Sequence, residues 1–219
     1  MRPVYLTVLS IISVLPVFSQ QKAKESIVRE MMEADIRRAG IVSLESSSNK
    51  RTYRIWTTYQ QLIELSEQSD SQYEGYIFNY IDRTSGRGER KRTELVTQKA
   101  PIPENRIKDI MNFLLSENIE TLPDDIEIEG YPRGLDGTTY VFEIQTLDFH
   151  RVYSFWEPMN DAYVDGEIPE IANVRSILRR LDLEFAPWKY FEKFRDKLPP
   201  GNYTYGGIDM VKLRQLKTK

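Results

Sequence analysis

The sequence predicts an α+β fold, with a mainly antiparallel sheet built from hairpins and helices packed on one face of it. Three observations support this class. Segments rich in β-branched and aromatic residues come in neighbouring pairs, as hairpins require. Longer segments have apolar residues three and four positions apart, the spacing of an amphipathic helix. The two kinds of segment do not alternate as regular β-α-β units, which argues against a parallel sheet.

The start of the chain, residues 1–19, is typical of a secretory signal peptide. Arg2 supplies a positive charge, the run Val4–Phe18 is largely apolar, and Ser19 is a small residue at the expected cleavage point. The alternative is a membrane anchor, but a spanning helix needs ~20 apolar residues and this run is shorter. We therefore expect an exported protein without a stable membrane anchor after signal removal, and residues 20–219 as a single α+β domain.

The next segment, Lys22–Ala39, has a helical stripe of apolar residues and is followed by Gly40, a residue typical of helix ends. Ile41–Leu44 is predicted as a short strand. Thr52–Leu65 begins with strand alternation, but its second half, Tyr59–Leu65, fits either a continued strand or a helix. The sequence leaves this choice open.

Two hairpins are predicted further along the chain. The first pairs residues 76–81 with 93–98 across a long basic loop, 82–92. The second pairs residues 138–145 with 149–156. Its register depends on the loop: three loop residues place Glu143 opposite Arg151 as an ion pair, whereas two place it opposite Val152.

Three further helices complete the predicted fold. The stripe formed by Ile107, Ile110, Met111 and Leu114 predicts a helix at about 103–118. Similar stripes predict a helix at about 169–181 and another that starts near Pro187. Pro199–Gly207 is predicted to be a turn-rich segment, and the basic tail after it is predicted to be loose.

Composition excludes several chemistries. The 219 residues include no cysteine, which removes disulfides, thiol nucleophiles and cysteine-ligated metal sites. The single histidine, His150, excludes zinc sites with two or three histidines. Without residues 1–19 the chain has 29 basic and 33 acidic residues, a net charge of −4, so a dedicated nucleic-acid binder is not expected. We expect no metal and no cofactor.

Asp136, Glu143 and His150 are the candidate catalytic residues of a hydrolase that uses carboxylates. His150 is the only imidazole for acid–base chemistry, but no Gly-x-Ser-x-Gly elbow accompanies it. Residues seven apart on one strand point to opposite faces, so Asp136 and Glu143 are not expected to meet. Asp136-Gly137 also has a local role, because this pair favours a turn. The local rules therefore favour a structural role for these acids.

Two charged stretches stand out. The segment 83–92 holds five cations and is the candidate binding surface for phosphate, an acidic glycan or an acidic partner. Its cations are Arg83, Arg87, Arg90, Lys91 and Arg92. The segment 117–129 is acidic without the spacing of a calcium loop. We expect this acidic segment to be a solvated face, or to neutralise the basic one.

The segment from Leu135 to Pro158 resembles a pattern of uncharacterised, often exported, bacterial proteins. The pattern has an apolar residue, Asp-Gly-Thr, an aromatic residue and a glutamate, followed by a short turn and an aromatic-rich strand. The matching residues are Leu135, Asp136, Gly137, Thr138, Tyr140, Glu143, Tyr153, Trp156 and Pro158. This resemblance implies a β-hairpin module and transfers no activity.

Together these observations favour an exported, non-enzymatic binding module, periplasmic or secreted from a bacterium. An exported chain of this length without disulfides fits a bacterial envelope better than an animal secretory pathway. The expected partner is an envelope protein or glycan, which the tyrosine-rich strands could contact through their aromatic rings. The alternative is a small envelope hydrolase that uses carboxylates.

Overall fold

A computed structural model describes most of the chain after the predicted signal peptide. The described residues are 30, 32–44, 47–57, 60–86, 90–132, 134, 137–164 and 168–213. The predicted signal peptide 1–19 and two candidate site residues, Arg87 and Asp136, lie outside this part.

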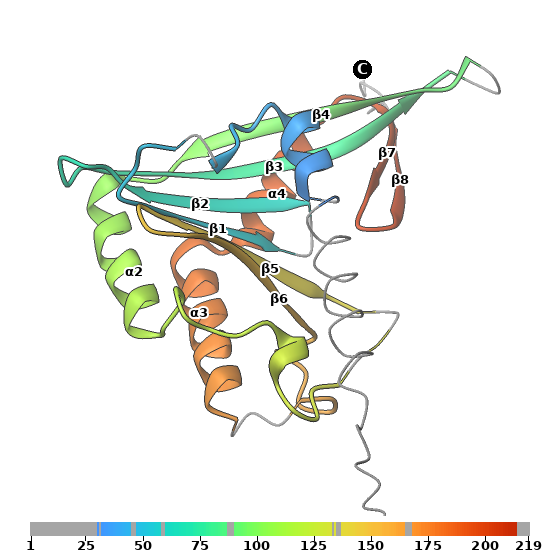
Figure 1. The fold of residues 1–219 in the computed structure, drawn as a ribbon. Helices are drawn as coiled ribbons and strands as arrows, with labels where there is room; N and C mark the ends of the chain where they lie inside the picture. Colours follow the sequence, from blue (N-terminus) through green and yellow to red (C-terminus); the bar gives the residue numbers. More distant parts are fainter. Residues whose placement is uncertain are drawn as a thin grey trace, which may run out of the picture.

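The described chain forms a sheet of eight strands in which every pair is antiparallel (Figure 1). The main path runs β6-β5-β1-β2-β3-β7-β8, and β4 pairs with β3. The predicted α+β class is therefore confirmed. The strands are β1 (Arg51–Thr57), β2 (Gln61–Glu67), β3 (Tyr73–Ser85), β4 (Arg92–Pro101), β5 (Thr139–Thr146), β6 (His150–Trp156), β7 (Gly201–Tyr205) and β8 (Ile208–Lys212).

Both predicted hairpins are present, as β3–β4 and β5–β6. The β5–β6 turn takes the shorter of the two predicted registers: Thr146 N donates to Phe149 O at 2.9 Å, and Glu143 lies opposite Val152. The segment 52–65, ambiguous in sequence, forms two strands, β1 and β2, that pair with each other.

Two local predictions are wrong. Residues 41–44 do not form a strand, because the buried side chains of Ile41 and Leu44 and the carbonyl of Val42 are used in packing against the sheet. The segment 199–207, predicted as turn-rich, is largely a strand: it contains β7, which pairs with β3 and β8. Its tyrosines Tyr203 and Tyr205 alternate into the core, and burial of these two rings favours a strand.

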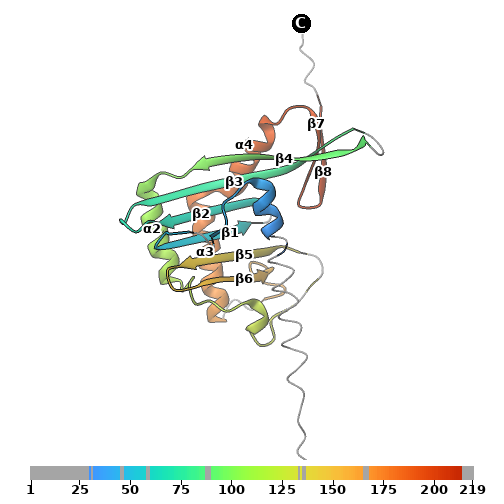
Figure 2. The same ribbon diagram turned by 45° about the horizontal axis from the view of Figure 1, so that its top comes forward.

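The helices lie on both faces of the sheet. The predicted helices α2 (Glu104–Ser116), α3 (Pro169–Phe185) and α4 (Pro187–Lys197) are present and cover one face. The helix at residues 32–39 lies on the opposite face, in front of the sheet in Figure 2. Successive side chains of a strand point to opposite faces of the sheet, so both faces can present apolar side chains to a helix.

In β1, Tyr53 and Ile55 point into the core shared with α2 and α3. The alternate residue Trp56 points the other way, toward Met32 and Ile36 of the N-terminal helix. One strand therefore serves two separate cores.

The acidic segment is only partly the solvated face that its composition predicts: Glu127 and Glu129 are exposed, but two aspartates take part in the fold. Asp124 and Asp125, at the short helix η3 (Asp125–Glu127), accept hydrogen bonds from the backbone of β6. The donors are Ser154 N, at 2.9 Å from Asp124 Oδ2, and Trp156 N, at 2.8 Å from Asp125 Oδ2. These acids satisfy N–H groups on an edge strand, where no further strand can do so. Among the described residues, no ion pair joins this segment to the basic loop, which lies on the β3–β4 side of the sheet.

Candidate functional site

A row of three charged side chains crosses the centre of the sheet. Glu64, Arg54 and Glu143 lie directly opposite one another on β2, β1 and β5. Arg54 Nε is 2.6 Å from Glu64 Oε2, and Arg54 Nη1 is 3.3 Å from Glu143 Oε2. The side chains of Arg54 and Glu143 are only 2% and 5% exposed. We call these residues the central charged row; all three charges are paired, Arg54 and Glu143 are buried, and Glu64 is partly buried.

His150 extends this row on β6. Its Nε2 lies 2.9 Å from Glu143 Oε1, while the other carboxylate oxygen accepts from Arg54. The two-residue turn places His150 opposite Gln145 and therefore diagonal to Glu143. With one ring nitrogen bound by a buried carboxylate, the imidazole is held in one orientation. The structure thus brings two of the three candidate catalytic residues together.

The predicted partner of Glu143 in the longer register, Arg151, has other contacts. Its guanidinium donates to the carbonyl oxygens of Glu120 and Leu122, at 3.0 and 2.6 Å. Arg151 therefore anchors the segment after α2 to the sheet and takes no part in the charged row.

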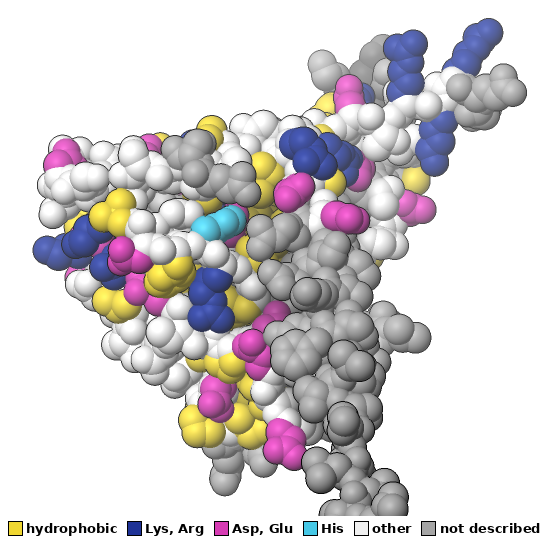
Figure 3. All heavy atoms as spheres, in the orientation of Figure 1, with side chains coloured by type: hydrophobic (Ala, Val, Ile, Leu, Met, Phe, Trp, Pro, Cys, Tyr) yellow, Lys and Arg dark blue, Asp and Glu magenta, His cyan; other side chains and the backbone are white. Residues whose placement is uncertain are grey.

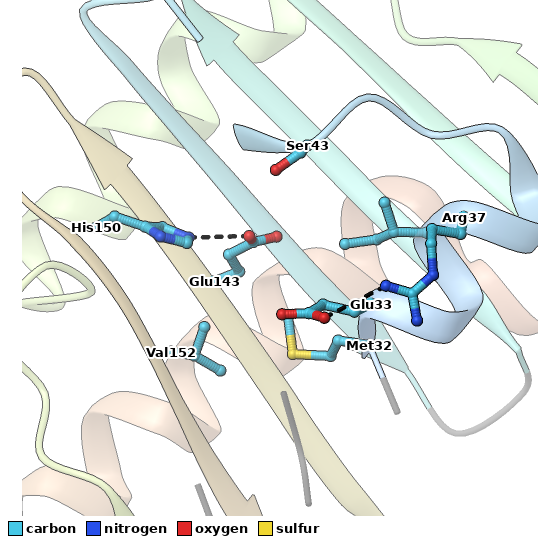
Figure 4. A pocket seen from close by; sticks show the side chains of 8 residues that line it. Met32, Glu33, Arg37, Ser43, Glu143, His150 and Val152 are labelled. Atoms are coloured by element: carbon cyan, nitrogen blue, oxygen red, sulfur yellow. Dashed lines mark hydrogen bonds and ion pairs between the residues drawn. The ribbon is translucent and has the colours of Figure 1, made fainter. Parts of the chain in front are cut away.

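A hollow of about 250 Å³ opens beside Glu143 and His150 (Figure 4). We call it the His–Glu hollow. Met32 and Ile36 of the N-terminal helix and Val152 of β6 form its apolar side, and the other lining side chains are polar or charged. Its lining residues are Met32, Glu33, Ile36, Arg37, Ser43, Glu143, His150 and Val152.

The arrangement around the carboxylate differs from a serine hydrolase triad. In such a triad the histidine lies between the serine and the acid. In Figure 4 the Ser43 hydroxyl and the His150 ring both approach the Glu143 carboxylate, so the acid lies between the other two groups. The chemistry that remains is the activation of a water molecule by His150, with Glu143 positioning the ring.

The N-terminal helix, which forms one wall of the hollow, is attached to the sheet by polar contacts. Tyr80 donates to Asp35 Oδ2 at 3.0 Å, and Arg38 forms an ion pair with Asp82. Burial raises the pKa of Asp35 above its usual range, although the hydrogen bond from Tyr80 and the charge of Arg38 act in the opposite direction. Burial also raises the pKa of Tyr80. These contacts hold the wall in place.

The second candidate site is the far half of the β3–β4 hairpin. β2 begins at Gln61, opposite Asn79 of β3. Beyond Asn79 the β3–β4 hairpin continues without β2 beside it (Figure 1). We call this continuation, residues 80–86 and 90–97, the basic arm. It turns at Gly86, where φ is +80° and a Cβ atom would overlap the carbonyl oxygen of Arg90. Only glycine fits this turn without strain.

The cations of the basic arm differ in their surroundings. Arg83 is paired with Glu94 at 3.2 Å, with side chains 36% and 62% exposed. Arg90, Lys91 and Arg92 are exposed and form no ion pair with a described residue. Figure 3 shows dark blue side chains where this hairpin projects from the molecule. The structure therefore separates Arg83, which is partly neutralised, from three available cations.

Sequence reasoning did not find Arg54 and Glu64, the partners that hold Glu143. One signal was present: Arg54 stands within the run Tyr53–Trp56, whose other three residues are apolar or aromatic. The expectation of aromatic contact surfaces is wrong for the strand tyrosines Tyr53, Tyr80, Tyr153 and Tyr203, which are buried. Burial of such large rings contributes more to the core than exposure would to a surface.

No protein-family model matches this chain, and no curated protein matches it. The resemblance at residues 135–158 stays a prediction. Within the described residues, no helix is long and apolar enough to span a membrane. In the same part of the chain, no three His, Asp or Glu side chains are grouped to hold a metal ion.

Proposed function

We propose that this protein is a non-enzymatic binding module that contacts an acidic envelope protein or acidic glycan through its basic arm. The observation that supports this function is the presence of three exposed cations without a described ion-pair partner on a β-hairpin that projects from the sheet. The signal-peptide pattern supports the envelope as the place of action.

The geometry suits the binding of an anionic surface. Arg90, Lys91 and Arg92 follow one another at the start of β4, so they present several charges within a short length of chain. No ion pair within the described chain has to break before these cations meet a partner. Such exposed charges mainly speed association, and their effect falls as salt screens them.

The test is retention of a partner from a bacterial envelope extract by the immobilised mature protein at low salt. The variant replaces Arg90, Lys91 and Arg92 with glutamine. We expect the wild-type protein to retain an acidic partner that elutes as salt rises, and the variant to lose it.

The matched control removes the same charge elsewhere, with Lys108→Gln, Lys189→Gln and Lys193→Gln on exposed helical positions. Equal loss of retention in both variants would show a net-charge effect and would contradict the role of the arm. Equal retention by all three proteins would also contradict it.

A second candidate function, the carboxylate hydrolase, is favoured by the convergence of Glu143 and His150 beside the His–Glu hollow. It ranks second because both Glu143 oxygens already have partners, Arg54 and His150. A hydrolase here would use His150 as the base for a water molecule.

This second function predicts turnover of a cell-wall or glycan substrate by the wild-type protein and none by His150→Gln. Glu143→Gln should change the pH profile of the reaction, because it removes the charge beside the imidazole. The basic-arm variant is the control and should keep full turnover. Absence of turnover in the wild-type protein would eliminate this candidate.

A further inference from the structure

A second hollow lies on the α3 side of the sheet and has a different chemistry. Its volume is about 330 Å³. It lies between the helices α3 and α4 on one side and the end of β1, the start of β5 and the segment after β6 on the other. We call it the Tyr–Trp hollow. Its lining is mostly apolar, with three polar side chains. The lining residues are Thr57, Tyr140, Met159, Leu178, Arg179, Leu181, Asp182, Pro187 and Trp188.

The walls of this hollow are held by contacts behind them. Buried Arg175 donates to Pro158 O at 2.6 Å and to Val164 O at 3.1 Å, which holds the segment that carries Met159. On the other side, the Trp188 ring stacks on Phe191, with centroids 5.9 Å apart and planes 26° apart. A site whose walls are already ordered loses less entropy when a ligand binds.

The backbone between α3 and α4 supports the same conclusion. Ala186 has φ +42° and ψ +61°, the left-handed region that non-glycine residues rarely adopt. This residue sets the angle at which Pro187 and Trp188 enter the hollow. Left-handed residues commonly end helices, and the Ala186 N–H donates to Asp182 O at 2.8 Å, so this helix end fixes the position of the wall.

The hollow carries one positive and one negative side chain, so a ligand with a single charge gains no net electrostatic attraction from them. Arg179 and Asp182 lie one turn apart on α3, both are exposed, and neither has an ion-pair partner among the described residues. Asp182 would repel a carboxylate that Arg179 attracts, and Arg179 would repel an amine that Asp182 attracts. A neutral ligand with hydroxyl groups can accept from the guanidinium and donate to the carboxylate.

We propose that the Tyr–Trp hollow binds one pyranose ring of a neutral saccharide. A pyranose has an apolar C–H face, which matches the rings of Tyr140 and Trp188, and hydroxyl groups, which match Arg179 and Asp182. Aromatic and aliphatic walls with a few polar groups that orient the ligand are typical of small-molecule sites. This site is separate from the basic arm and does not depend on it.

The test is isothermal titration of the whole mature protein with three neutral disaccharides: maltose, cellobiose and diacetylchitobiose. Glucuronate and glucosamine test the charge argument, and indole tests a purely apolar site. We expect saturable binding of at least one neutral disaccharide and weaker binding of both charged sugars.

Two variants locate the site. Asp182→Ala, on the exposed side of α3, removes the acceptor and should weaken binding at least about tenfold, the cost of losing a hydrogen bond to a charged group. Trp188→Ala should abolish binding, and a thermal melt shows whether this variant is folded. Leu183→Ala, at a position 83% exposed and outside the hollow, is the matched control and should bind normally.

Three results would overturn the proposal: no saturable binding of any neutral disaccharide, binding of indole alone, or unchanged saccharide affinity in Asp182→Ala. The glutamine variant of the basic arm should bind the saccharide normally. Loss of the acidic partner by the arm variant tests the proposed function, and loss of saccharide binding tests the Tyr–Trp hollow, so the two failures can be told apart.

Discussion

The central charged row and the basic arm are both built from charged residues on paired β-strands, but they differ in burial. Arg54 is 2% exposed and lies between two carboxylates, Glu64 and Glu143. Arg90 and Lys91 are exposed and have no ion-pair partner among the described residues. Charge type alone therefore says little about role. A buried, paired charge is part of the structure, whereas an exposed, unpaired charge is available to a partner.

The largest expected effect is unfolding of the buried core at high pH, under conditions in which the charges of the arm arginines do not change. Burial raises the pKa of Tyr53, Tyr80, Tyr131 and Tyr153 above the unfolded value of about 10. A raised folded pKa contributes stability that is fully present below the unfolded value and is lost as pH rises through the folded values. We expect cooperative unfolding above pH ~10, while the arm arginines stay charged.

The measurement follows tyrosinate absorbance and far-ultraviolet circular dichroism in one pH titration. The two signals should change together for the buried tyrosines. Ionisation of all tyrosines near pH ~10 with an unchanged dichroism spectrum would contradict the burial of these rings.

The second-largest effect is expected when the cation of the central charged row is removed. Arg54→Met leaves Glu64 and Glu143 facing each other across β1 without a cation, and should lower the free energy of unfolding by about 3–5 kcal/mol. Urea unfolding measures this loss. Arg83→Met is the matched control, because Arg83 forms an exposed pair with Glu94 and its loss should cost about 0–1 kcal/mol. Equal costs in the two variants would contradict the difference between buried and exposed pairs.

A smaller effect is expected at the end of the row. His150→Leu removes the hydrogen bond to Glu143 Oε1 and should lower the free energy of unfolding by about 0.5–1.5 kcal/mol. His150→Gln, whose amide can donate to the same oxygen, should recover part of this loss. If both variants unfold at the wild-type urea concentration, the imidazole does not contribute to the row.

The smallest effect is expected on the basic arm. Replacing Arg90, Lys91 and Arg92 together with glutamine should change the free energy of unfolding by less than about 0.5 kcal/mol, because none of them has a described ion pair. Urea unfolding of this variant beside Arg54→Met makes the comparison direct. A loss of several kcal/mol would show that the arm cations are structural.

The sequence predicted both hairpins and the helices α2, α3 and α4, because local periodicity is enough to define them. It left the segment 52–65 open, since Tyr59–Leu65 fits two periods equally well. Pairing with β1 and β3 resolves that segment as β2, with Leu62 and Ile63 buried on opposite faces. The strand β7 escaped prediction because the prolines before it and the glycines at its ends suggest turns, and only contact with β3 and β8 gives it partners.

The site residues show the same division. Glu143 and His150 were predicted as candidates, but their contact depends on a turn that is one residue shorter than the ion-pair register required. Arg54 lies 89 positions from Glu143, so no local rule connects them. For Arg90 to Arg92, the sequence predicted the charge, and the structure shows which cations lack a partner in the described chain.

The sequence by itself determined the fold class, most elements and the absence of cysteine chemistry, because these follow from composition and from periods of two and three to four residues. Tertiary structure alone decided which charges are buried, which pairs meet across the sheet and where the hollows open. The physical reason is that burial and pairing depend on contacts between strands and helices far apart in the chain, and the free energy of a charge is set by those surroundings.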